Sequence, residues 1–245
     1  MIILRILAIV QARTGSKRLP NKVLMTIQGK PILEHIVNFL KFSKKIDEII
    51  VATSDLKSDD KIESLCKKIN VNCFRGDSKN VLKRYFDCAS QYNGDIVVRI
   101  TADNPLIDPK IVDKGISVLV DQNFDYVSNM IHQSYPEGYL VEVFTFNTLR
   151  YVYETFHDEL SKEHVTFQLR QCPKGIKIGE FFTAKNKQRP NWRLTVDYEN
   201  DLKLIKRIFL VLYKPDSFIS YDSVFDFLKQ NTFLFEINQK HSAKA

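Results

Sequence analysis

Residues 6–22 read ILAIVQARTGSKRLPNK, an apolar run followed at once by a basic loop. The apolar part predicts a buried strand over Ile6–Ala12. The loop contains four cations, Arg13, Lys17, Arg18 and Lys22. These cations repel one another unless an anion lies among them. Because open α/β sheets bind nucleotides at the carboxyl ends of parallel strands, the segment predicts a triphosphate site.

Small and polar residues at the same place support this interpretation. Gly15 lets the backbone approach a ligand closely, and Ser16 adds a hydroxyl beside it. The loop lacks the Gly-Lys-Ser/Thr of a P-loop and the glycine spacing of a dinucleotide fingerprint. The alternative is a solvated turn that is basic by chance, which the glycine and the Leu19-Pro20 pair disfavour.

Length and composition restrict the class of protein. The chain has 245 residues, 44% of them apolar, and a formal net charge of +7. This length suits a single domain over residues 1–245. No apolar run reaches the ~18 residues that span a bilayer, and the N-terminus does not resemble a signal peptide. We therefore expect a soluble cytoplasmic protein with no membrane partner, whose four cysteines, which lack metal-ligand spacing, are reduced.

The positive charge leaves two kinds of partner open. A nucleic-acid-binding module would bind in a strongly salt-dependent way. The sequence shows no basic helix stripe and no basic face interleaved with aromatic residues, and such a module would not explain aspartates at strand ends. We expect no nucleic-acid partner, since anionic metabolites account for the charge equally well.

Strand and helix signals alternate along the first half of the chain. Strands are expected over 6–12, 49–52, 71–74, 96–100 and 126–128, and helices over 31–40, 58–69, 81–92 and 109–120. This repeated β-α-β order predicts an α/β fold with a mostly parallel sheet and helices on both faces.

The pattern changes in the second half. Residues 129–190 indicate an α+β region, with strands over 140–146 and 176–182 and helices over 148–154 and 160–171. A strand over 193–196 and helices over 199–212 and 222–229 follow, and residues 241–245 are expected to fray.

Two aspartates follow predicted strands and could hold a metal. Asp103 comes just after the strand over 96–100 and after Thr101, and Asp197 ends the strand over 193–196. A hard cation such as Mg²⁺ takes one or two carboxylates together with phosphate oxygens. The alternative is that both aspartates cap turns or helices, as we expect of Asp108 before Pro109.

Several segments together resemble the cytidylyltransferases of the CMP-KDO and CMP-sialic acid synthetase superfamily, in particular its SpsF-like branch for spore coat polysaccharide. The first motif of that branch, Q-A-R-x-G-S-x-R-L-P-x-K, matches residues 11–22. Further similar stretches lie at 74–77, 98–109, 125–129, 163–166 and 195–197. The resemblance covers roughly residues 5–230.

The resemblance implies a nucleotidyltransferase fold similar to glycosyltransferase-A domains. It implies transfer of CMP from CTP, with Mg²⁺, to an acidic sugar or a phosphorylated small acceptor, in the synthesis of surface polysaccharide precursors, with release of pyrophosphate. It also implies that residues 129–190 form the acceptor side and the contact of a homodimer.

The resemblance also assigns roles to residues. Catalysis falls to Arg13, Lys22, Asp103 and Asp197, of which Asp103 and Asp197 are the metal ligands. Nucleotide binding falls to Gln11, Ala12, Arg13, Gly15, Ser16, Arg18, Lys22, Thr101 and Asp103. Glu142 and His164 are candidates to contact the acceptor, although Glu142 could instead face solvent and His164 could be a packed neutral histidine.

The chain departs from the branch at positions that leave alternatives open. Asn21 replaces a usual glycine, and Leu140 replaces a usual aspartate that faces the acceptor, which puts the identity of the acceptor in doubt. One alternative is a glycosyltransferase of similar fold, which usually has an Asp-x-Asp motif where this chain has Thr101-Ala-Asp103. Another is a non-catalytic nucleotide-binding protein.

Overall fold

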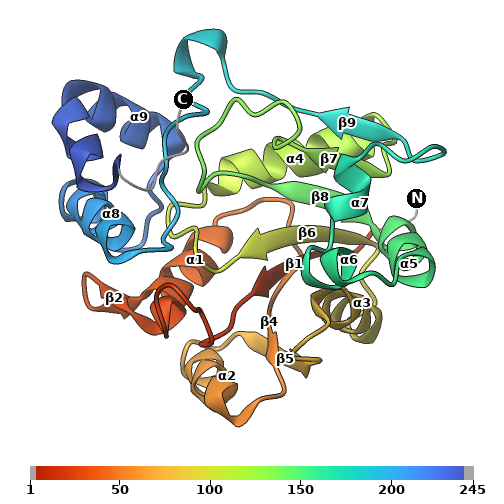
Figure 1. Cartoon of the computed structure of the whole chain (residues 1–245). Helices are drawn as coiled ribbons and strands as arrows, with labels where there is room; N and C mark the ends of the chain where they lie inside the picture. The colour runs from red at the N-terminus through yellow and green to blue at the C-terminus, as the bar shows by residue number, and fades with distance from the viewer. Residues whose placement is uncertain (1–3, 240–245) are drawn as a thin grey trace.

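The computed structural model describes residues 4–239 and contains one large sheet (Figure 1). Seven strands lie in the order β5-β4-β1-β6-β8-β7-β9. Their bounds are β1 Ile6–Gln11, β4 Glu48–Ser54, β5 Asn72–Gly76, β6 Ile96–Thr101, β7 Tyr126–Ser128, β8 Glu142–Thr145 and β9 Ile178–Glu180. Among these described strands β8 alone runs against the others, which confirms the mostly parallel sheet. A small antiparallel hairpin pairs β2 (Thr26–Ile27) with β3 (Lys30–Pro31).

Helices cover both faces of the large sheet, as expected. Their bounds are α1 Ile32–Leu40, α2 Asp60–Lys68, α3 Val81–Gln91, α4 Pro109–Asp121, α5 Phe146–Thr155, α6 Glu159–Glu163, α7 Phe167–Arg170, α8 Glu199–Leu212 and α9 Tyr221–Gln230. Side chains of β1 alternate between the faces. Ala8 and Val10 belong to the core that includes α1, α4 and α8, whereas Leu7 and Ile9 belong to the core under α3 and α5.

The order of the strands opens a crevice beside β1. The chain runs from β1 to β4 and β5 on one side, and then crosses to β6 on the other side (Figure 1). Gln11 at the end of β1 pairs in register with Thr101 at the end of β6. Sheets of this kind bind ligands where the strand order reverses, at the carboxyl ends of the strands.

Two predicted elements are wrong. Arg193 forms only an isolated bridge with Glu137, so residues 193–196 form no strand. The helix expected over 160–171 is divided into α6 and α7, because His164 leaves helical backbone angles and the β-branched residues Val165 and Thr166 that follow it are buried. Burial of these two side chains turns the chain inward.

Other expectations are confirmed or fall outside the described part. Asp108 is the N-cap of α4, and its Oδ1 accepts a hydrogen bond from the backbone nitrogen of Lys110 at 2.8 Å. The expected fraying at 241–245 lies outside the described residues. None of the helices within residues 4–239 combines the length and the apolar character that a bilayer crossing requires.

Candidate active site

A buried carboxylate holds the basic loop against the end of β4. Asp59 Oδ1 accepts hydrogen bonds from the backbone nitrogen of Thr14 at 2.8 Å and from Thr14 Oγ1 at 2.6 Å. Burial opposes the ionisation of Asp59, but hydrogen bonds from Ser54 and Thr14 outweigh it and lower the pKa. Asn21 has a φ of 59°, in the left-handed region that asparagine adopts more readily than most residues. The asparagine in place of the usual glycine therefore keeps the turn.

Backbone contacts bring the two predicted metal ligands together. The backbone nitrogen of Val196 donates to the carbonyl oxygen of Asp103 at 2.8 Å. Gly138 has a φ of +108°, and a Cβ at this position would lie 2.6 Å from the carbonyl oxygen of Leu194. The glycine therefore allows the close approach that places Asp197 beside Asp103.

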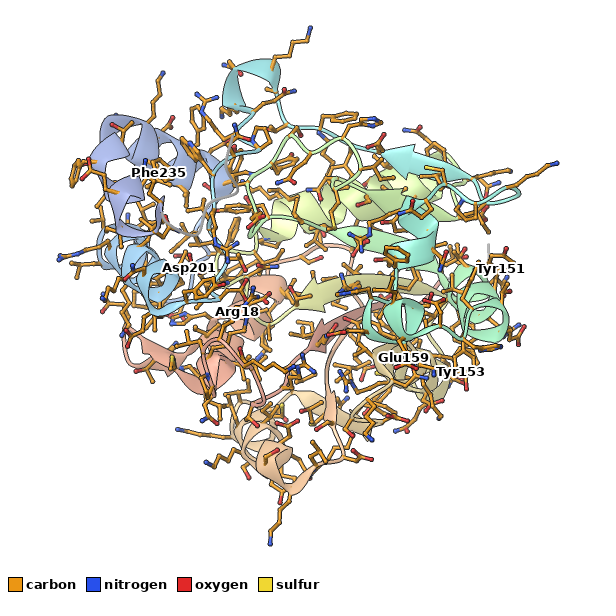
Figure 2. The ribbon with its side chains drawn as sticks, in the orientation of Figure 1. Arg18, Tyr151, Tyr153, Glu159, Asp201 and Phe235 are labelled. Carbon is orange, nitrogen blue, oxygen red and sulfur yellow. The ribbon has the colours of Figure 1, made fainter. Side chains whose placement is uncertain are left out.

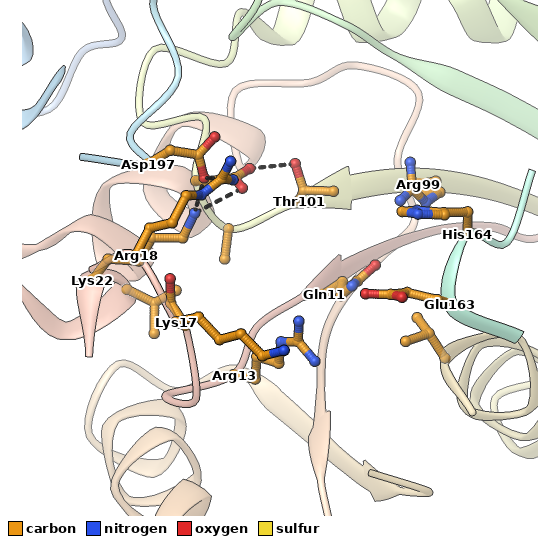
Figure 3. A pocket seen from close by; sticks show the side chains of 15 residues that line it. Gln11, Arg13, Lys17, Arg18, Lys22, Arg99, Thr101, Glu163, His164 and Asp197 are labelled. Carbon is orange, nitrogen blue, oxygen red and sulfur yellow. Dashed lines mark hydrogen bonds and ion pairs between the residues drawn. The ribbon is translucent and has the colours of Figure 1, made fainter. Parts of the chain in front are cut away.

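Lys22 lies between the two aspartates, and Figure 3 shows its side chain close to Asp197. Its Nζ donates to Asp103 Oδ2 at 3.0 Å, to Asp197 Oδ1 at 2.8 Å and to the carbonyl oxygen of Val196 at 2.9 Å. Thr101 Oγ1 donates to the other oxygen of Asp103 at 2.5 Å. The basic loop and both carboxylates thus meet at the same edge of the sheet.

Asp197 has two further cationic partners. Arg18 Nη2 lies 2.7 Å from its Oδ1, and Arg193 Nη2 lies 2.8 Å from its Oδ2. Burial opposes the ionisation of Asp197, but Lys22, Arg193 and Arg18 outweigh it and lower the pKa. The N-cap of α8 is Tyr198 and not Asp197, and Asp201 in the first turn accepts a hydrogen bond from the backbone nitrogen of Tyr198 at 2.9 Å. Figure 2 shows Arg18 and Asp201 on the same side of the molecule.

A cavity of about 470 Å³ opens beside this cluster. The predicted residues that line it are Gln11, Arg13, Ser16, Arg18, Lys22, Thr101, Asp103, His164 and Asp197. In Figure 3, Lys22 and Asp197 lie at one side of the cavity, and Gln11 and His164 lie at the other. The side chain of Ala12 packs in the core instead, and Gly15 is absent from the lining.

The two predicted acceptor residues lie in contrasting surroundings. Glu142 is buried and accepts from Arg99 Nη1 and from the hydroxyl of Tyr126, both at 2.6 Å. Burial opposes its ionisation, but the charge of Arg99 and hydrogen bonds from Thr166 and Tyr126 outweigh it and lower the pKa of Glu142. Glu142 therefore does not face solvent. His164 is exposed at the end of α6 and is not a packed histidine.

A smaller cavity of about 220 Å³ adjoins the main one. The two share Arg99, Thr101 and Asp103 in their linings. Leu140 and Glu142 also line the smaller cavity. The position at which this chain departs from the SpsF-like branch therefore lies close to the aspartate cluster.

Sequence reasoning assigned no role to several residues of the main cavity. These are Val23, Val81, Ala102 and Glu163. Glu163 was recognisable as the neighbour of His164. No local pattern marks Val81, because its place at the cavity follows from the packing of α3 against β1.

Comparisons with known proteins agree with this geometry. The family model described as cytidylyltransferase matches residues 7–240. An uncharacterized protein of Methanocaldococcus jannaschii, MJ1063, is 39% identical over 99% of this chain and 98% of its own length. The spore coat polysaccharide biosynthesis protein SpsF of Bacillus subtilis is 33% identical over 83% of this chain and 86% of its own length.

A solved structure extends the likeness to three dimensions. The structure of a cytidylyltransferase from Leptospira borgpetersenii superposes with a TM-score of 0.89 at 29% identity, and covers 95% of this chain and 97% of its own. The family model, the curated relative and the solved structure therefore agree with the resemblance seen in the first motif. This chain belongs to the cytidylyltransferase family.

Proposed function

We propose that this protein transfers CMP from CTP to an acidic sugar, such as a KDO-like or nonulosonate-like sugar acid, and releases pyrophosphate. A phosphorylated small acceptor is the second acceptor class. The observation that carries the proposal is the meeting of Lys22, Asp103 and Asp197 beside the basic loop. Membership of the cytidylyltransferase family supports CTP as the donor.

The cationic lining of the cavity suits a triphosphate. Arg13, Lys17, Arg18, Lys22 and Arg99 all line it. A nucleoside triphosphate brings about four negative charges, and like charges ~4 Å apart repel by a few kcal/mol even at an effective dielectric constant of ~20. The cations offset this repulsion when an anionic acceptor approaches.

Gly15 supports a ligand at the loop. A Cβ there would meet no protein atom within 4 Å, so packing within the protein does not require glycine. Open space beside the backbone is what a close contact with phosphate oxygens needs.

The aspartates suit a hard divalent cation. Asp103 and Asp197 present carboxylate oxygens, and the hydroxyl of Thr101 lies beside Asp103, which is the ligand chemistry that Mg²⁺ prefers. We propose that these two carboxylates hold Mg²⁺ together with the triphosphate. The bound metal would polarise the phosphoryl oxygens.

In the proposed reaction the side chains of this protein bind and orient the two substrates. The hydroxyl of a sugar acid gives up its proton to solvent, its oxygen attacks the α-phosphorus in line, and the new P–O bond forms as the bond to the bridging oxygen breaks, so that pyrophosphate leaves. The phosphate oxygen of a phosphorylated acceptor is already ionised and attacks without loss of a proton. Arg13 and Lys22 hold the triphosphate, and His164 contacts the acceptor. Glu142 already accepts hydrogen bonds from Arg99 and Tyr126. We therefore propose that Glu142 holds Arg99 in position at the part of the cavity that binds the acceptor.

We also propose that residues 129–190 form a homodimer contact. Phe182 within this region and Leu160 on α6 are large apolar side chains that are exposed. Sedimentation equilibrium of the purified chain tests this, and a monomer at micromolar concentration would contradict it.

A pyrophosphate-release assay tests the proposed reaction. The protein is incubated with Mg²⁺ and each of the four nucleoside triphosphates, against a panel of sugar acids and phosphorylated polyols. We expect release of pyrophosphate with CTP and a sugar acid, formation of the CMP-sugar in equal amount, and loss of both products on chelation of the metal. Absence of pyrophosphate with every pair would contradict the proposal and favour a non-catalytic nucleotide-binding protein.

A further inference from the structure

The ammonium group of Lys22 uses all of its hydrogen-bond donors within the protein. An ammonium carries three N–H donors, and here they meet Asp103, Asp197 and the carbonyl oxygen of Val196 within 3.0 Å. The Lys22 side chain is only 11% exposed. The lysine is therefore held between the carboxylate pair, which we define as Asp103 and Asp197.

Two arginines add to the positive charge at the same place. Arg18 and Arg193 both contact Asp197. Arg193 is shared with Glu137 and Asp201, whereas the side chain of Arg18 is 53% exposed. The carboxylate pair is thus already neutralised by side chains of the protein. A divalent cation that arrives alone must displace Lys22 and approach two guanidinium groups.

The arrival of a triphosphate changes this balance. Phosphate oxygens compete with the carboxylate pair for Lys22 and Arg18, which line the cavity and contact the pair at the same time. Once the lysine turns to the phosphates, both carboxylates are left without their shared partner. The same movement therefore provides a cation for the nucleotide and two oxygen ligands for a metal.

From these contacts we infer that Lys22 is an internal counter-ion that excludes free divalent cations from the carboxylate pair until a nucleoside triphosphate takes up its ammonium group. The metal then enters with the nucleotide and not before it. This inference rests on the proposed function for the role of the nucleotide. It assigns Lys22 a positioning role in addition to binding phosphate.

Binding of Mn²⁺ alone, without nucleotide, tests the inference. The signal of free Mn²⁺ in electron paramagnetic resonance falls as the ion binds. We expect Lys22→Met to bind Mn²⁺ at least ~10-fold more tightly than the wild type, because an unpaired carboxylate pair attracts the cation. Replacing Asp103 by Asn in the Lys22→Met background should abolish the gain.

Two matched variants separate this effect from a general change in charge. Lys17→Met removes a cation from the same cavity that makes no carboxylate contact in the described structure, and it should leave Mn²⁺ binding within about twofold of the wild type. Lys22→Arg keeps the positive charge and should also remain like the wild type. Added Mn²⁺ should raise the Tm of Lys22→Met more than that of the wild type.

The outcomes distinguish this inference from the proposed function. Equal Mn²⁺ affinity in the wild type and in Lys22→Met would overturn the inference. If Lys22→Met does not fold, tight wild-type binding of Mn²⁺ that disappears in Asp103→Asn would overturn it as well. None of these measurements involves turnover, so failure of the pyrophosphate assay would leave them valid.

Discussion

Two clusters of ion pairs, one just after the end of β6 and one on β6 itself, differ in construction. The edge cluster is Lys22, Asp103 and Asp197, and the buried cluster is Arg99, Glu142 and Tyr126. In the edge cluster the side chains are 11–26% exposed, whereas in the buried cluster Glu142 is 2% exposed and Arg99, which lines both cavities, is 15% exposed. The edge cluster also meets Arg18 and Arg193, whereas the buried cluster pairs one cation with one carboxylate.

The origin of the contacts differs as well. Arg99 and Glu142 are register partners on adjacent strands, so the sheet itself places them opposite each other. The edge cluster joins a loop, a strand end and a segment before α8, and we infer that its partners exchange when a nucleotide binds. An excess of cations and partners drawn from loops therefore distinguish the edge cluster, for which we propose ligand binding, from the one-to-one pair of the buried cluster, which joins two adjacent strands.

Removing Glu142 should produce the largest effect on stability. Glu142→Ala leaves Arg99, which is 15% exposed, without its carboxylate, and loss of one partner of a buried pair lowers the free energy of unfolding by about 3–5 kcal/mol. Urea denaturation measures this change. Asp103→Ala removes a carboxylate that is 26% exposed and leaves Lys22 paired with Asp197, so it should lower the same quantity by only about 1 kcal/mol. Equal losses in the two variants would remove the distinction between the clusters.

Removing either aspartate of the edge cluster should produce the largest effect on turnover. Asp103→Ala and Asp197→Ala should each lower kcat by at least ~100-fold, or about 2.7 kcal/mol, while the fold is retained. Pyrophosphate release and circular dichroism measure the two quantities. Asp121→Ala, at an exposed carboxylate at the end of α4, is the control and should keep normal turnover. Normal turnover in either edge variant would exclude that residue from the metal site.

The sequence was sufficient to place two members of the edge cluster, Lys22 and Asp103, whereas Asp197 was predicted from a strand over 193–196 that does not form. The apolar run of β1 and the cations after it place the loop at the carboxyl edge, and a strand followed by Asp103 places a carboxylate there too. An apolar run indicates a buried strand, and the polar residues after it indicate where that strand ends. These features can be recognised from nearby residues alone, without knowing which strands pair in the sheet. The parallel order follows from the alternation of strands and helices.

The buried cluster could not be predicted in this way. Glu142 reads as a polar residue in a short strand, and only the pairing of β8 with β6 reveals Arg99 opposite it. Apolar and polar residues alternate over Arg193–Val196, which is typical of a strand. In the structure this segment forms only an isolated bridge, between Arg193 and Glu137. The missed Arg99–Glu142 pair and the wrong strand have the same cause, because pairing partners lie far away in the chain.

Acidification tests the ionic contribution of the buried cluster, and its effect should be smaller than that of removing the side chain. The pKa of Glu142 is lowered in the folded protein, so the stability that its carboxylate contributes is present above its unfolded pKa of about 4.3 and is lost as the pH falls through the folded pKa. The free energy of unfolding should therefore fall more steeply with decreasing pH below about 4.3 in the wild type than in Glu142→Gln. Urea denaturation at a series of pH values measures the two slopes. Parallel slopes would mean that the carboxylate contributes no ionic stabilisation.

Replacing His164 should have the smallest effect, and it tests whether exposure at the cavity is enough to mark a binding residue. His164 lies at the end of α6, exposed and on the wall opposite the edge cluster (Figure 3). His164→Ala should leave the free energy of unfolding within about 0.5 kcal/mol. It should raise KM for the acceptor by roughly threefold to tenfold, because one hydrogen bond contributes about 1 kcal/mol, with turnover little changed. His157→Ala, at an exposed histidine outside the cavity lining, is the control and should leave KM unchanged. A loss of turnover as large as that expected for the aspartate variants would instead make His164 a catalytic residue, and ligand chemistry would then extend across the cavity from the edge cluster to α6.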